Sequence, residues 1–453
     1  MALAALKLPA ALAPVLQAVE RAGGRALVVG GAVRDAFLGR PPEDWDVEVY
    51  GLSETRLAEC LAPFGAHRVG ARLAVFVAAG AEFALPQGTW QGVDPHLPWA
   101  EAARRRDFTV NAMAWDPRTE TLLDAWGGQE DLRAGRLRMV DARSFADDPL
   151  RVLRAARFTG QLGFAIHPLT ASRCRHLAPQ LGRVAGERVR KEWEAILLRG
   201  VDLPRSWDAL QETGAIALFP ELRALQGVPQ RPDAHPEGDV WIHTGRVLAA
   251  AGHLRRGQRE RDLILMLAAL LHDLGKAVVT RRDAQGRWRA IGHEQSLVPA
   301  QSFLARWFPG PALTRQILPL LRWHGAPHAL ARDGAGTAAY GRLALRVPDR
   351  SLLLDLALAD ARGAGAGAEG MPAALQKARE IWSALGVLGA LPAPWVRGED
   401  LMALGIPPGP ALGKALQLAL ELQVSGAYAD RGAVLAVLQR RMAGSSRPDD
   451  HAC

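Results

Sequence analysis

Residues 30–49 read GGAVRDAFLGRPPEDWDVEV, and this stretch decides what fold the first part of the chain adopts. Just before it, ALVVGG at 26–31 predicts a short buried strand closed by two glycines. AVRDAFLG then predicts a short helix that ends at Gly39, and DWDVEVYG predicts a second strand. Residues 72–85 alternate apolar positions around a small-residue turn, which predicts a hairpin. We therefore expect an α/β unit with a small mixed sheet.

Three acidic side chains share one face of the predicted second strand: Asp44, Asp46 and Glu48. Side chains two residues apart lie about 7 Å from each other along a strand, so Asp44 and Asp46 can converge on one point above the sheet. Such carboxylates repel each other unless a cation lies between them, and hard oxygen ligands select Mg²⁺. A pair of Mg²⁺ ions serves in-line attack on phosphorus, so the strand predicts phosphoryl or nucleotidyl transfer. A solvated acidic edge strand would give the same pattern.

Gly30 and Gly31 stand just before the predicted helix, where backbone N–H groups and the helix dipole can hold a triphosphate. Arg34 lies one turn into that helix and can add positive charge. The segment contains neither G-x-G-x-x-G nor G-K-[ST], so it is neither a dinucleotide fingerprint nor a P-loop. A tight turn is the plain alternative. The closeness of the glycines to the two aspartates favours a nucleotide site.

The second half of the chain carries a different pattern. After about residue 140 the strand signals fade, and the rest is predicted to be all-helical. QGVPQRPDAHPEG at 226–238 is a proline-rich connector, and RGAGAGAEGMP at 362–372 is a Gly/Ala linker, so both predict domain boundaries.

GGAVRDAFLGRPPEDWDVEV resembles the signature of the polymerase-beta-type nucleotidyltransferases of the CCA-adding and poly(A) polymerase family. The resemblance implies that Gly30 and Gly31 hold the triphosphate and that Asp44 and Asp46 carry catalytic Mg²⁺. It covers nearly the whole chain and is strongest over 27–192. The implied fold class is α+β, mostly helical, with a polymerase-beta-like head. The expected domains are the catalytic head (1–140), a helical neck with a nucleotide-templating helix (141–225), an HD-type metal-dependent phosphohydrolase-like domain (226–365) and a helical tRNA-binding tail (366–453).

RRRDFTVNA at 104–112 resembles the family block that contacts the sugar and phosphates of the incoming nucleotide. Arginine supplies forked donors for phosphate, and Asn and Asp can bind ribose hydroxyls. A solvated turn is the other interpretation. The matching positions are Arg105, Arg106, Asp107, Thr109 and Asn111.

FADDPLRVLRAARF at 145–158 predicts an amphipathic helix with Asp148 and Arg151 on one face. An acceptor pair beside a donor fork is what reading a base edge requires. The segment resembles the family's E-D-x-x-R block, in which the protein itself is the template for C and A, with Asp147 in place of the leading Glu. The resemblance places Arg154 and Arg157 toward nucleotide or RNA phosphate. Ordinary i,i+3 ion pairs are the alternative.

Two further blocks match the family. GGQEDL, at 127–132, fits a turn between head and neck, and GERVRKE, at 186–192, fits a block that is structural. The loop LPQGTWQGVDPHLPWAEAA at 85–103 departs from the pattern, because it is shorter than in enzymes that add the full CCA. Pro86 and Gln87 stand where an Arg is frequent, and Ala102 where an Asp is frequent. In this family a short loop accompanies addition of only two cytidines, so CC addition and CCA addition both stay open.

A second set of metal-ligand residues follows. LILMLAALLHDLGK at 263–276 predicts an apolar helix that ends at His272 and Asp273, and both reach one ion only near a helix terminus, where Gly275 places them. Two His and two Asp suit a divalent transition metal or Mg²⁺. The pattern resembles an HD-type phosphohydrolase domain, which implies the ligands His243, His272, Asp273 and Asp360, with His293 and His324 available for a second site. A structural helical domain with ordinary histidines is the alternative.

The tail segment GEDLMALGIPPGPALGKALQLALELQ, from Gly398, resembles the family's tRNA-contacting helices. Backbone amides at a helix start flanked by Gly409 and Gly413, together with Lys414, could bind an RNA phosphate. A helix simply capped by Pro and Gly fits the segment equally well.

The bulk composition agrees with a nucleic-acid partner. The 453 residues carry 55 Lys plus Arg against 47 Asp plus Glu, a formal charge of +8, although an Arg-rich genome would also give a basic protein. Three scattered cysteines (Cys60, Cys174 and Cys453) predict neither a disulfide framework nor a structural zinc site, and they suit the cytoplasm. Neither a clean secretory signal nor a membrane span is evident in the sequence.

Together the motifs predict a tRNA 3′-end nucleotidyltransferase that uses CTP and ATP, with tRNA as partner and no obligatory protein partner evident. Three alternatives remain at this point: a poly(A) polymerase, an HD phosphohydrolase acting on RNA ends with an inactive head, and a tRNA-binding protein without catalysis.

Overall fold

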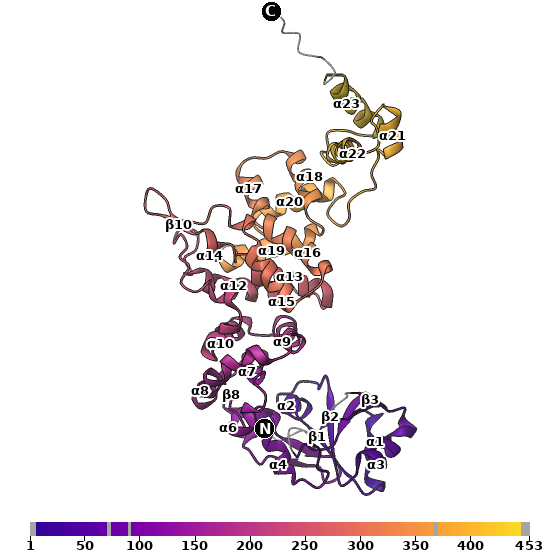
Figure 1. Ribbon diagram of the computed structural model, residues 1–453, viewed down its shortest axis with the longest axis vertical. Helices are drawn as coiled ribbons and strands as arrows, with labels where there is room; N and C mark the ends of the chain where they lie inside the picture. The colour runs from indigo at the N-terminus through magenta and orange to yellow at the C-terminus, as the bar shows by residue number, and fades with distance from the viewer. Residues whose placement is uncertain (1–5, 70–73, 89–91, 366–369, 445–453) are drawn as a thin grey trace, which may run out of the picture. The chain divides into compact units, whose positions relative to one another are not determined.

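The computed structural model describes residues 6–69, 74–88, 92–365 and 370–444. The chain packs into two units, residues 1–192 with 205–218 and residues 193–204 with 219–453 (Figure 1). Cys453, the centre of the Gly/Ala linker, the first two residues of the predicted hairpin and part of the 85–103 loop lie outside the described residues. Cys60 and Cys174 are free thiols. No described helix is long and apolar enough to cross a membrane.

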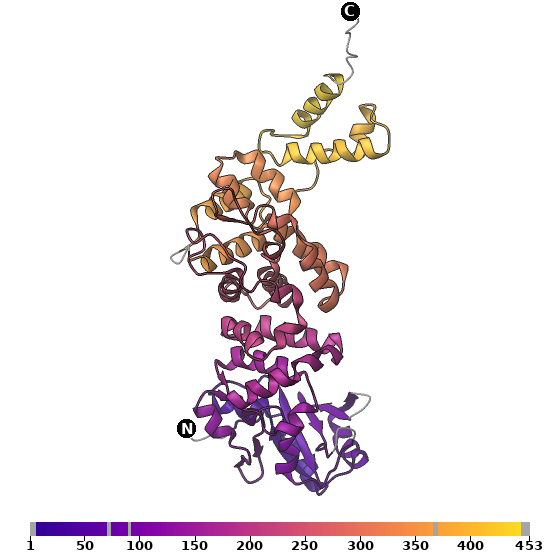
Figure 2. The ribbon, with the colours of Figure 1, turned by 60° about the vertical axis from the view of Figure 1, so that its left-hand side comes forward.

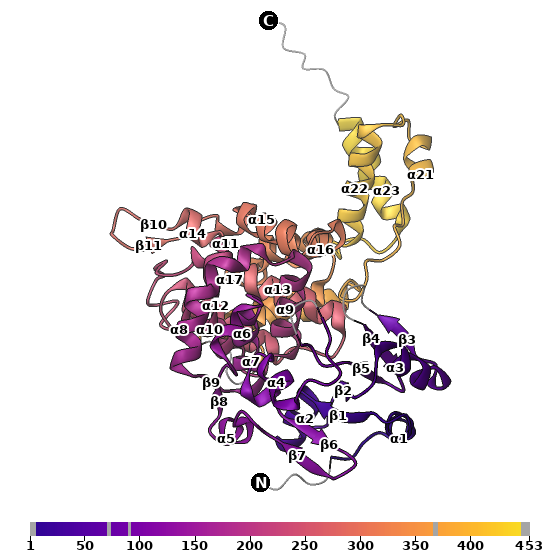
Figure 3. The ribbon, with the colours of Figure 1, turned by 60° about the horizontal axis from the view of Figure 1, so that its bottom comes forward.

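The first unit is built on a mixed seven-stranded sheet in the order β3-β4-β5-β2-β1-β6-β7 (Figure 3). β1 pairs antiparallel with β2 and β6, whereas β2 pairs in parallel with β5. The two predicted strands are confirmed, and β4 and β5 form the predicted hairpin. The strands are β1 (Arg25–Val29), β2 (Trp45–Tyr50), β3 (His67–Val69), β4 (Val75–Ala78), β5 (Ala81–Ala84), β6 (Ala114–Asp116) and β7 (Thr121–Leu123).

The register of β1 with β2 separates an apolar face from an acidic one. Ala26 pairs with Val49 and Val28 pairs with Val47, and all four of these side chains are buried. Asp46 pairs with Val29 on the opposite face, since side chains alternate along a strand. Directly after β1 comes α2 (Gly31–Phe37), which ends before Gly39 as predicted.

Helices surround the sheet and continue the first unit. α1 and α3 pack on each other, and α1 also contacts β1. α9 runs from the first unit into the second. The helices are α1 (Leu12–Arg21), α3 (Glu54–Leu61), α4 (Trp99–Arg104), α5 (Gly128–Arg133), α6 (Ala142–Ala146), α7 (Arg151–Leu162), α8 (Pro168–Leu177), α9 (Gly186–Arg199) and α10 (Leu203–Glu212).

The expectation that Asp148 and Arg151 share a helical face is wrong. α6 and α7 are separate helices, and Asp148 lies in the turn between them, where its carboxylate accepts a hydrogen bond from the Leu150 N–H at 3.2 Å. The cause is Pro149, because the residue before a proline is disfavoured in the helical conformation.

The second unit is almost entirely helical. Its central helix, α13 (Arg259–Leu271), is buried from Asp262 to Leu271 and packs against α12 (Val240–Gly252), α16 (Pro311–Trp323) and α19 (Arg350–Gly363). Edge-to-face aromatic contacts join Trp193 to Phe219 and Phe303. The other helices are α11 (Pro220–Arg223), α14 (Lys276–Val279), α15 (Val298–Trp307), α17 (Ala326–Arg332), α18 (Thr337–Arg346), α20 (Ala373–Ala384), α21 (Gly398–Ala403), α22 (Pro410–Gln423) and α23 (Arg431–Gly444).

The last three helices share an apolar cluster of their own, which includes Leu401, Ala419 and Val434, and they are the yellow segment of Figure 2. The prediction that everything after about residue 140 is helical is wrong in two places. β8 (Arg136–Leu137) pairs in parallel with β9 (Ala165–Ile166), and β10 (Arg281–Arg282) forms a hairpin with β11 (Trp288–Arg289). At the second place the turn is formed by Asp283 and by Gly286, whose φ is +76°. A search for helical periodicity does not detect such a turn.

A buried ion-pair network fixes α7 and α9 to the loop after α4. Asp107 is 6% exposed, and its Oδ2 accepts hydrogen bonds from Nε and Nη2 of Arg154 at 2.8 and 2.5 Å. Glu192 on α9 pairs with Arg154 at 3.6 Å and with Arg157 at 2.8 Å. Burial alone would raise the pKa of Asp107, but Arg154 and a hydrogen bond from Asn111 hold it well below its ordinary value.

Arg154→Met should lower the free energy of unfolding of the first unit by about 3 kcal/mol, because it leaves the buried Asp107 carboxylate without its cation. Urea unfolding of the full chain measures the change. Adding Asp107→Asn should recover part of the loss, because the pair is coupled. Arg183→Met, at an exposed arginine of the same unit, is the control and should shift stability by less than about 0.5 kcal/mol. Equal midpoints for Arg154→Met and this control would contradict the assignment.

Candidate functional site

Three carboxylates gather where β2 begins. Asp44 precedes the strand, Asp46 is its second residue, and Glu82 on β5 lies directly beside Asp46 in the parallel register. Burial raises the pKa of Asp46; Arg106 opposes this, whereas Asp44 and Glu48 add to it. Partial burial and the charges of Asp46 and Asp44 likewise raise the pKa of Glu82. This excess of negative charge fits divalent cations.

Glu82 was not predicted as a site residue. The only signal in the sequence is that it is the single polar position of the strand AEFA. Its partner in the sheet is Asp46, which is 36 positions earlier in the chain. Only a long-range strand pairing brings the two residues together.

Gly30 lies against this acidic cluster and requires the absence of a side chain. Its φ of +73° favours glycine. A Cβ built there would lie 3.0 Å from Nη1 of Arg106 and 3.4 Å from Oδ2 of Asp46. The glycine turn, β2 and the RRRD segment therefore meet at one point.

Glu48, whose role the sequence left open, holds Arg106. Its Oε1 is 3.5 Å from Nη2 of Arg106, and its Oε2 accepts a hydrogen bond from the Tyr50 hydroxyl at 2.7 Å. Burial and the Glu48 charge raise the pKa of Tyr50, so its hydroxyl remains a donor. Glu48 thus directs a guanidinium toward the carboxylate cluster.

A chain of polar contacts runs from α2 to α7. Nη1 of Arg34 donates to Oδ1 of Asn111 at 2.7 Å, and Nδ2 of Asn111 donates to Oδ1 of Asp107 at 3.0 Å. Asp107 in turn binds Arg154. Gly31 is next to Arg34, since a Cβ there would lie 3.7 Å from Nη2 of Arg34.

Three guanidinium groups surround the ring of Phe158. Arg34 and Arg154 each lie 5.3 Å from its centroid, and Arg157 lies 4.1 Å from it. Burial lowers the pKa of Arg157 to about 10, and Glu192 opposes that shift. Cation–π attraction offsets part of the repulsion among the three charges. Asp35, Asp107 and Glu192 pair with these three arginines, so the cluster is a compact set of guanidinium donors balanced by carboxylates.

The predicted base-reading pair is held by other groups. Arg151 donates to the carbonyl of Ser144 at 2.6 Å and to the carbonyl of Arg105. Asp148 accepts a hydrogen bond from Nη2 of Arg188 at 2.7 Å. Both residues stand at the N-terminal end of α7, and their role in reading a base remains a prediction.

The four residues of the predicted HD set come together in the second unit. Nε2 of His243 on α12 lies 3.0 Å from Oδ1 of Asp360 on α19 and 3.4 Å from Nε2 of His272. His272 caps the end of α13, and its Nε2 is 3.2 Å from Oδ2 of Asp273. The helix end thus lets both His272 and Asp273 face one point, as predicted.

Asp273 also faces a second group of ligands. Its Oδ1 is 3.3 Å from Nε2 of His293, and the His324 ring lies 5.4 Å from both the His272 and the His293 ring. Both oxygens of Asp273 are buried, and Oδ2 also lies 2.7 Å from Nζ of Lys276. Burial would raise the pKa of Asp273, but His272 and Lys276 hold it well below its ordinary value. Such a carboxylate fits a place between two cations.

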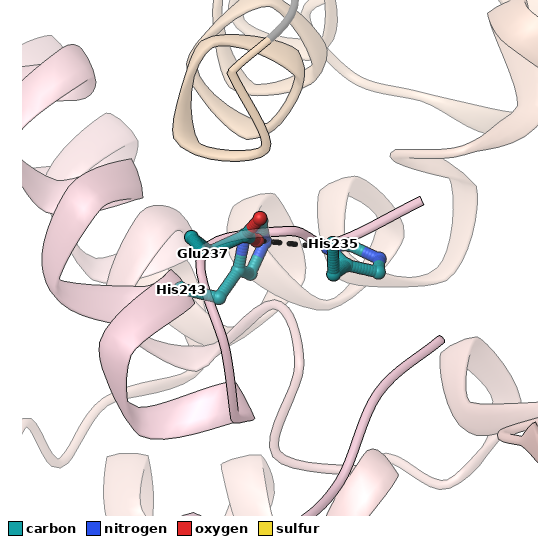
Figure 4. A group of neighbouring side chains, drawn as sticks. All are labelled: His235, Glu237 and His243. Carbon is teal, nitrogen blue, oxygen red and sulfur yellow. Dashed lines mark hydrogen bonds and ion pairs between the residues drawn. The ribbon is translucent and has the colours of Figure 1, made fainter. Parts of the chain in front are cut away.

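A third cluster comprises His235, Glu237 and His243 and lies on the Nδ1 side of the His243 ring (Figure 4). Oε1 of Glu237 is 2.7 Å from Nδ1 of His243 and 2.9 Å from Nδ1 of His235. Burial would raise the pKa of Glu237, but the hydrogen bond from His243 is among the effects that lower it to about 2. Sequence reasoning missed His235 and Glu237, because the proline-rich segment that carries them was interpreted only as a connector.

Lys414 is exposed on α22, which begins after Gly409 at φ +138°. Its RNA-binding role stays a prediction.

Three family models match the chain. The poly A polymerase head domain matches residues 86–138, the probable RNA and SrmB-binding site of polymerase A matches 163–225, and the HD domain matches 240–362.

Curated relatives and solved structures agree with these models. A protein of Halorhodospira halophila described as "Multifunctional CCA protein" is 36% identical over 363 residues, which is 74% of this chain and 83% of the relative. Its counterpart in Xanthomonas campestris is 38% identical over 300 residues, 62% of this chain and 70% of the relative. The CCA-adding enzyme of Bacillus stearothermophilus, solved in complex with CTP, is 26% identical with a TM-score of 0.66 and covers 97% of this chain and 99% of its own. This chain therefore belongs to the CCA-adding and poly(A) polymerase family of nucleotidyltransferases, among the members that carry an HD domain.

Proposed function

We propose that this protein extends the 3′ end of tRNA with cytidine, using CTP, and adenosine, using ATP, without a nucleic-acid template. The observation that carries the proposal is the convergence of Asp46, Gly30 and Arg106 at one end of the sheet. The relatives' description as CCA proteins supports it, as does a structure of a CCA-adding enzyme with CTP. We expect the reaction in the cytoplasm, and the free thiols of Cys60 and Cys174 agree with a reducing compartment.

The residues of the head divide the work between metal binding and phosphate binding. Asp44 and Asp46, with Glu82 beside them, would hold two Mg²⁺ ions. Bound there, the ions would activate the tRNA 3′-hydroxyl and stabilise the departing pyrophosphate. The backbone of Gly30 lies against Arg106. The N–H groups at the start of α2, together with Arg106, would orient the triphosphate for in-line attack.

The inner polar chain would bind the rest of the nucleotide. Arg34 and Asn111 are hydrogen-bonded to each other at 2.7 Å, and we assign them to the phosphates and the ribose. Asp148 and Arg151 would read the base, which requires them to exchange their present partners, Arg188 and two backbone carbonyls, for the base edge. Arg154 and Arg157, now paired with Asp107 and Glu192, would offer guanidinium donors to nucleotide or RNA phosphate.

Addition to three tRNA acceptors tests the proposal and the choice between CCA and CC. Purified protein with Mg²⁺ should transfer CMP from CTP, with release of pyrophosphate, to tRNA that ends at the discriminator base or at the first C. Incorporation of AMP from ATP into tRNA ending in CC would support addition of the full CCA. No incorporation there would limit the reaction to CC, the outcome that the short 85–103 loop keeps open. Asp44→Ala with Asp46→Ala should reduce incorporation at least ~100-fold, because the metal ligands are lost. Unchanged incorporation by this variant would refute the metal assignment.

We also propose a second activity, metal-dependent hydrolysis of phosphoesters at RNA ends by the HD domain. Two ligand groups that share Asp273 carry this proposal: His243, His272 and Asp360 on one side, and His293 and His324 on the other. Divalent cations held there would supply Lewis-acid activation of a phosphoester toward water.

His272→Ala should abolish release of phosphate from an RNA with a 3′-terminal phosphate, assayed in turn with Mg²⁺, Mn²⁺ and Ni²⁺. CTP incorporation by the same variant should be unchanged, because the metal ligands proposed for that reaction, Asp44 and Asp46, lie in the other unit. EDTA should stop both reactions. Full phosphate release by His272→Ala would show that the hydrolysis comes from elsewhere, and no release by the wild-type chain with any of these ions would refute the activity.

Glu237→Gln should weaken Mn²⁺ binding to the full chain about 10- to 100-fold, because Glu237 fixes Nδ1–H of His243 and leaves Nε2 for the metal. Titration calorimetry measures the affinity. His235→Gln is the matched control, since His235 shares Glu237 but is not in the ligand group with Asp360. Equal affinities for Glu237→Gln and wild type would contradict this role.

A further inference from the structure

The β10–β11 hairpin is bracketed by metal-ligand residues. It follows His272 and Asp273 through α14 and returns to His293. The chain before the hairpin and the chain after it are in close contact, because a Cβ on Gly275 would overlap the carbonyl oxygen of His293. Arg289 is four residues before His293, so at most about 14 Å of chain separates them. Figures 1 and 3 both show the hairpin projecting from the helices of its unit.

The hairpin carries a dense and organised positive charge. Residues 281–289 contain four arginines and one acid, Asp283. Oδ2 of Asp283 binds Nε of Arg287 at 3.0 Å and Nε of Arg289 at 3.1 Å, and its Oδ1 accepts hydrogen bonds from two backbone N–H groups of the turn. The single carboxylate therefore shapes the turn and leaves a net charge of +3.

Arg281 and Arg282 have no carboxylate partner among the residues that the structure describes. Both are exposed. The guanidinium of Arg282 lies over the Trp288 ring, 4.6 Å from its centroid, which is a cation–π contact. Between the hairpin and His293, Ile291 is 85% exposed. Positive charge, an aromatic ring and an exposed apolar side chain thus all lie between Asp273 and His293 in the sequence.

We propose that the β10–β11 hairpin binds the single-stranded 3′ end of an RNA and guides it to the HD metal centre, an inference that rests on the proposed hydrolytic activity. Single-stranded nucleic acid combines regularly spaced phosphates with flat bases, and it is bound by basic grooves with aromatic side chains. An acidic peptide would use the arginines but would leave the Arg282–Trp288 contact and Ile291 without a function.

Arg281→Gln with Arg282→Gln tests the proposal in the full chain. The KM for hydrolysis of a short 3′-phosphorylated RNA should rise about tenfold, while hydrolysis of bis(p-nitrophenyl) phosphate and CTP incorporation stay unchanged. The slope of log KM against log salt should fall by about 1.4, since each single-strand phosphate contact contributes about 0.7. Arg223→Gln with Arg332→Gln removes the same charge from exposed positions of the same unit and should change neither quantity. An RNA KM equal to that of this control would overturn the proposal.

Photo-crosslinking separates this inference from the proposed hydrolysis. A short RNA with 4-thiouridine near its 3′ end should crosslink to residues 281–289 of the His272→Ala variant, which needs no turnover. Crosslinks confined to other segments, or competition by a polyglutamate peptide but not by unlabelled RNA, would overturn the proposal even if hydrolysis itself is established.

Discussion

The antiparallel pairing of β1 with β2 places the end of one strand beside the start of the next. Val29 lies opposite Asp46, so the turn that follows Val29 is necessarily next to the carboxylate. Hydrogen bonds between the strands fix this register, and a shift of one residue would move the acids to the buried face. The apolar pairs Val28–Val47 and Ala26–Val49 make such a shift costly. The glycine turn and the acidic cluster are therefore positioned by the core behind them.

Both candidate metal centres combine a carboxylate that is at least partly buried with cationic neighbours, but in opposite electrostatic states. In the head, acids outnumber nearby cations, and the pKa of Asp46 is raised. In the HD domain, His272 and Lys276 surround Asp273, and its pKa is lowered. The head therefore attracts a hard cation through excess charge, whereas the HD site holds its carboxylate ionised in advance.

The sequence predicted the parts of each site that are close together in the chain. Gly30, Asp44 and Asp46 lie within one supersecondary unit, and His272 and Asp273 end one helix, so local pattern was sufficient. Glu82 and Glu237 were missed because strand pairing and a folded-back connector bring them in. Asp148 was predicted to lie on a helix because its three-residue spacing from Arg151 suggested one helical face. Pro149 disfavours the helical conformation at Asp148, and α7 begins only at Arg151. Side-chain networks such as Asp107–Arg154–Glu192 join segments whose approach no periodicity indicates.

Glu237 belongs to the segment 226–238, and its carboxylate contacts two histidines at once. One of them, His243, faces the proposed ions through its other nitrogen. If the proposed ions bind there, ordering of this segment and occupancy of the site are thermodynamically linked, and the linkage is reciprocal. Whatever loosens the segment weakens the hold on the ion, and the bound ion in turn lowers the entropy of the segment.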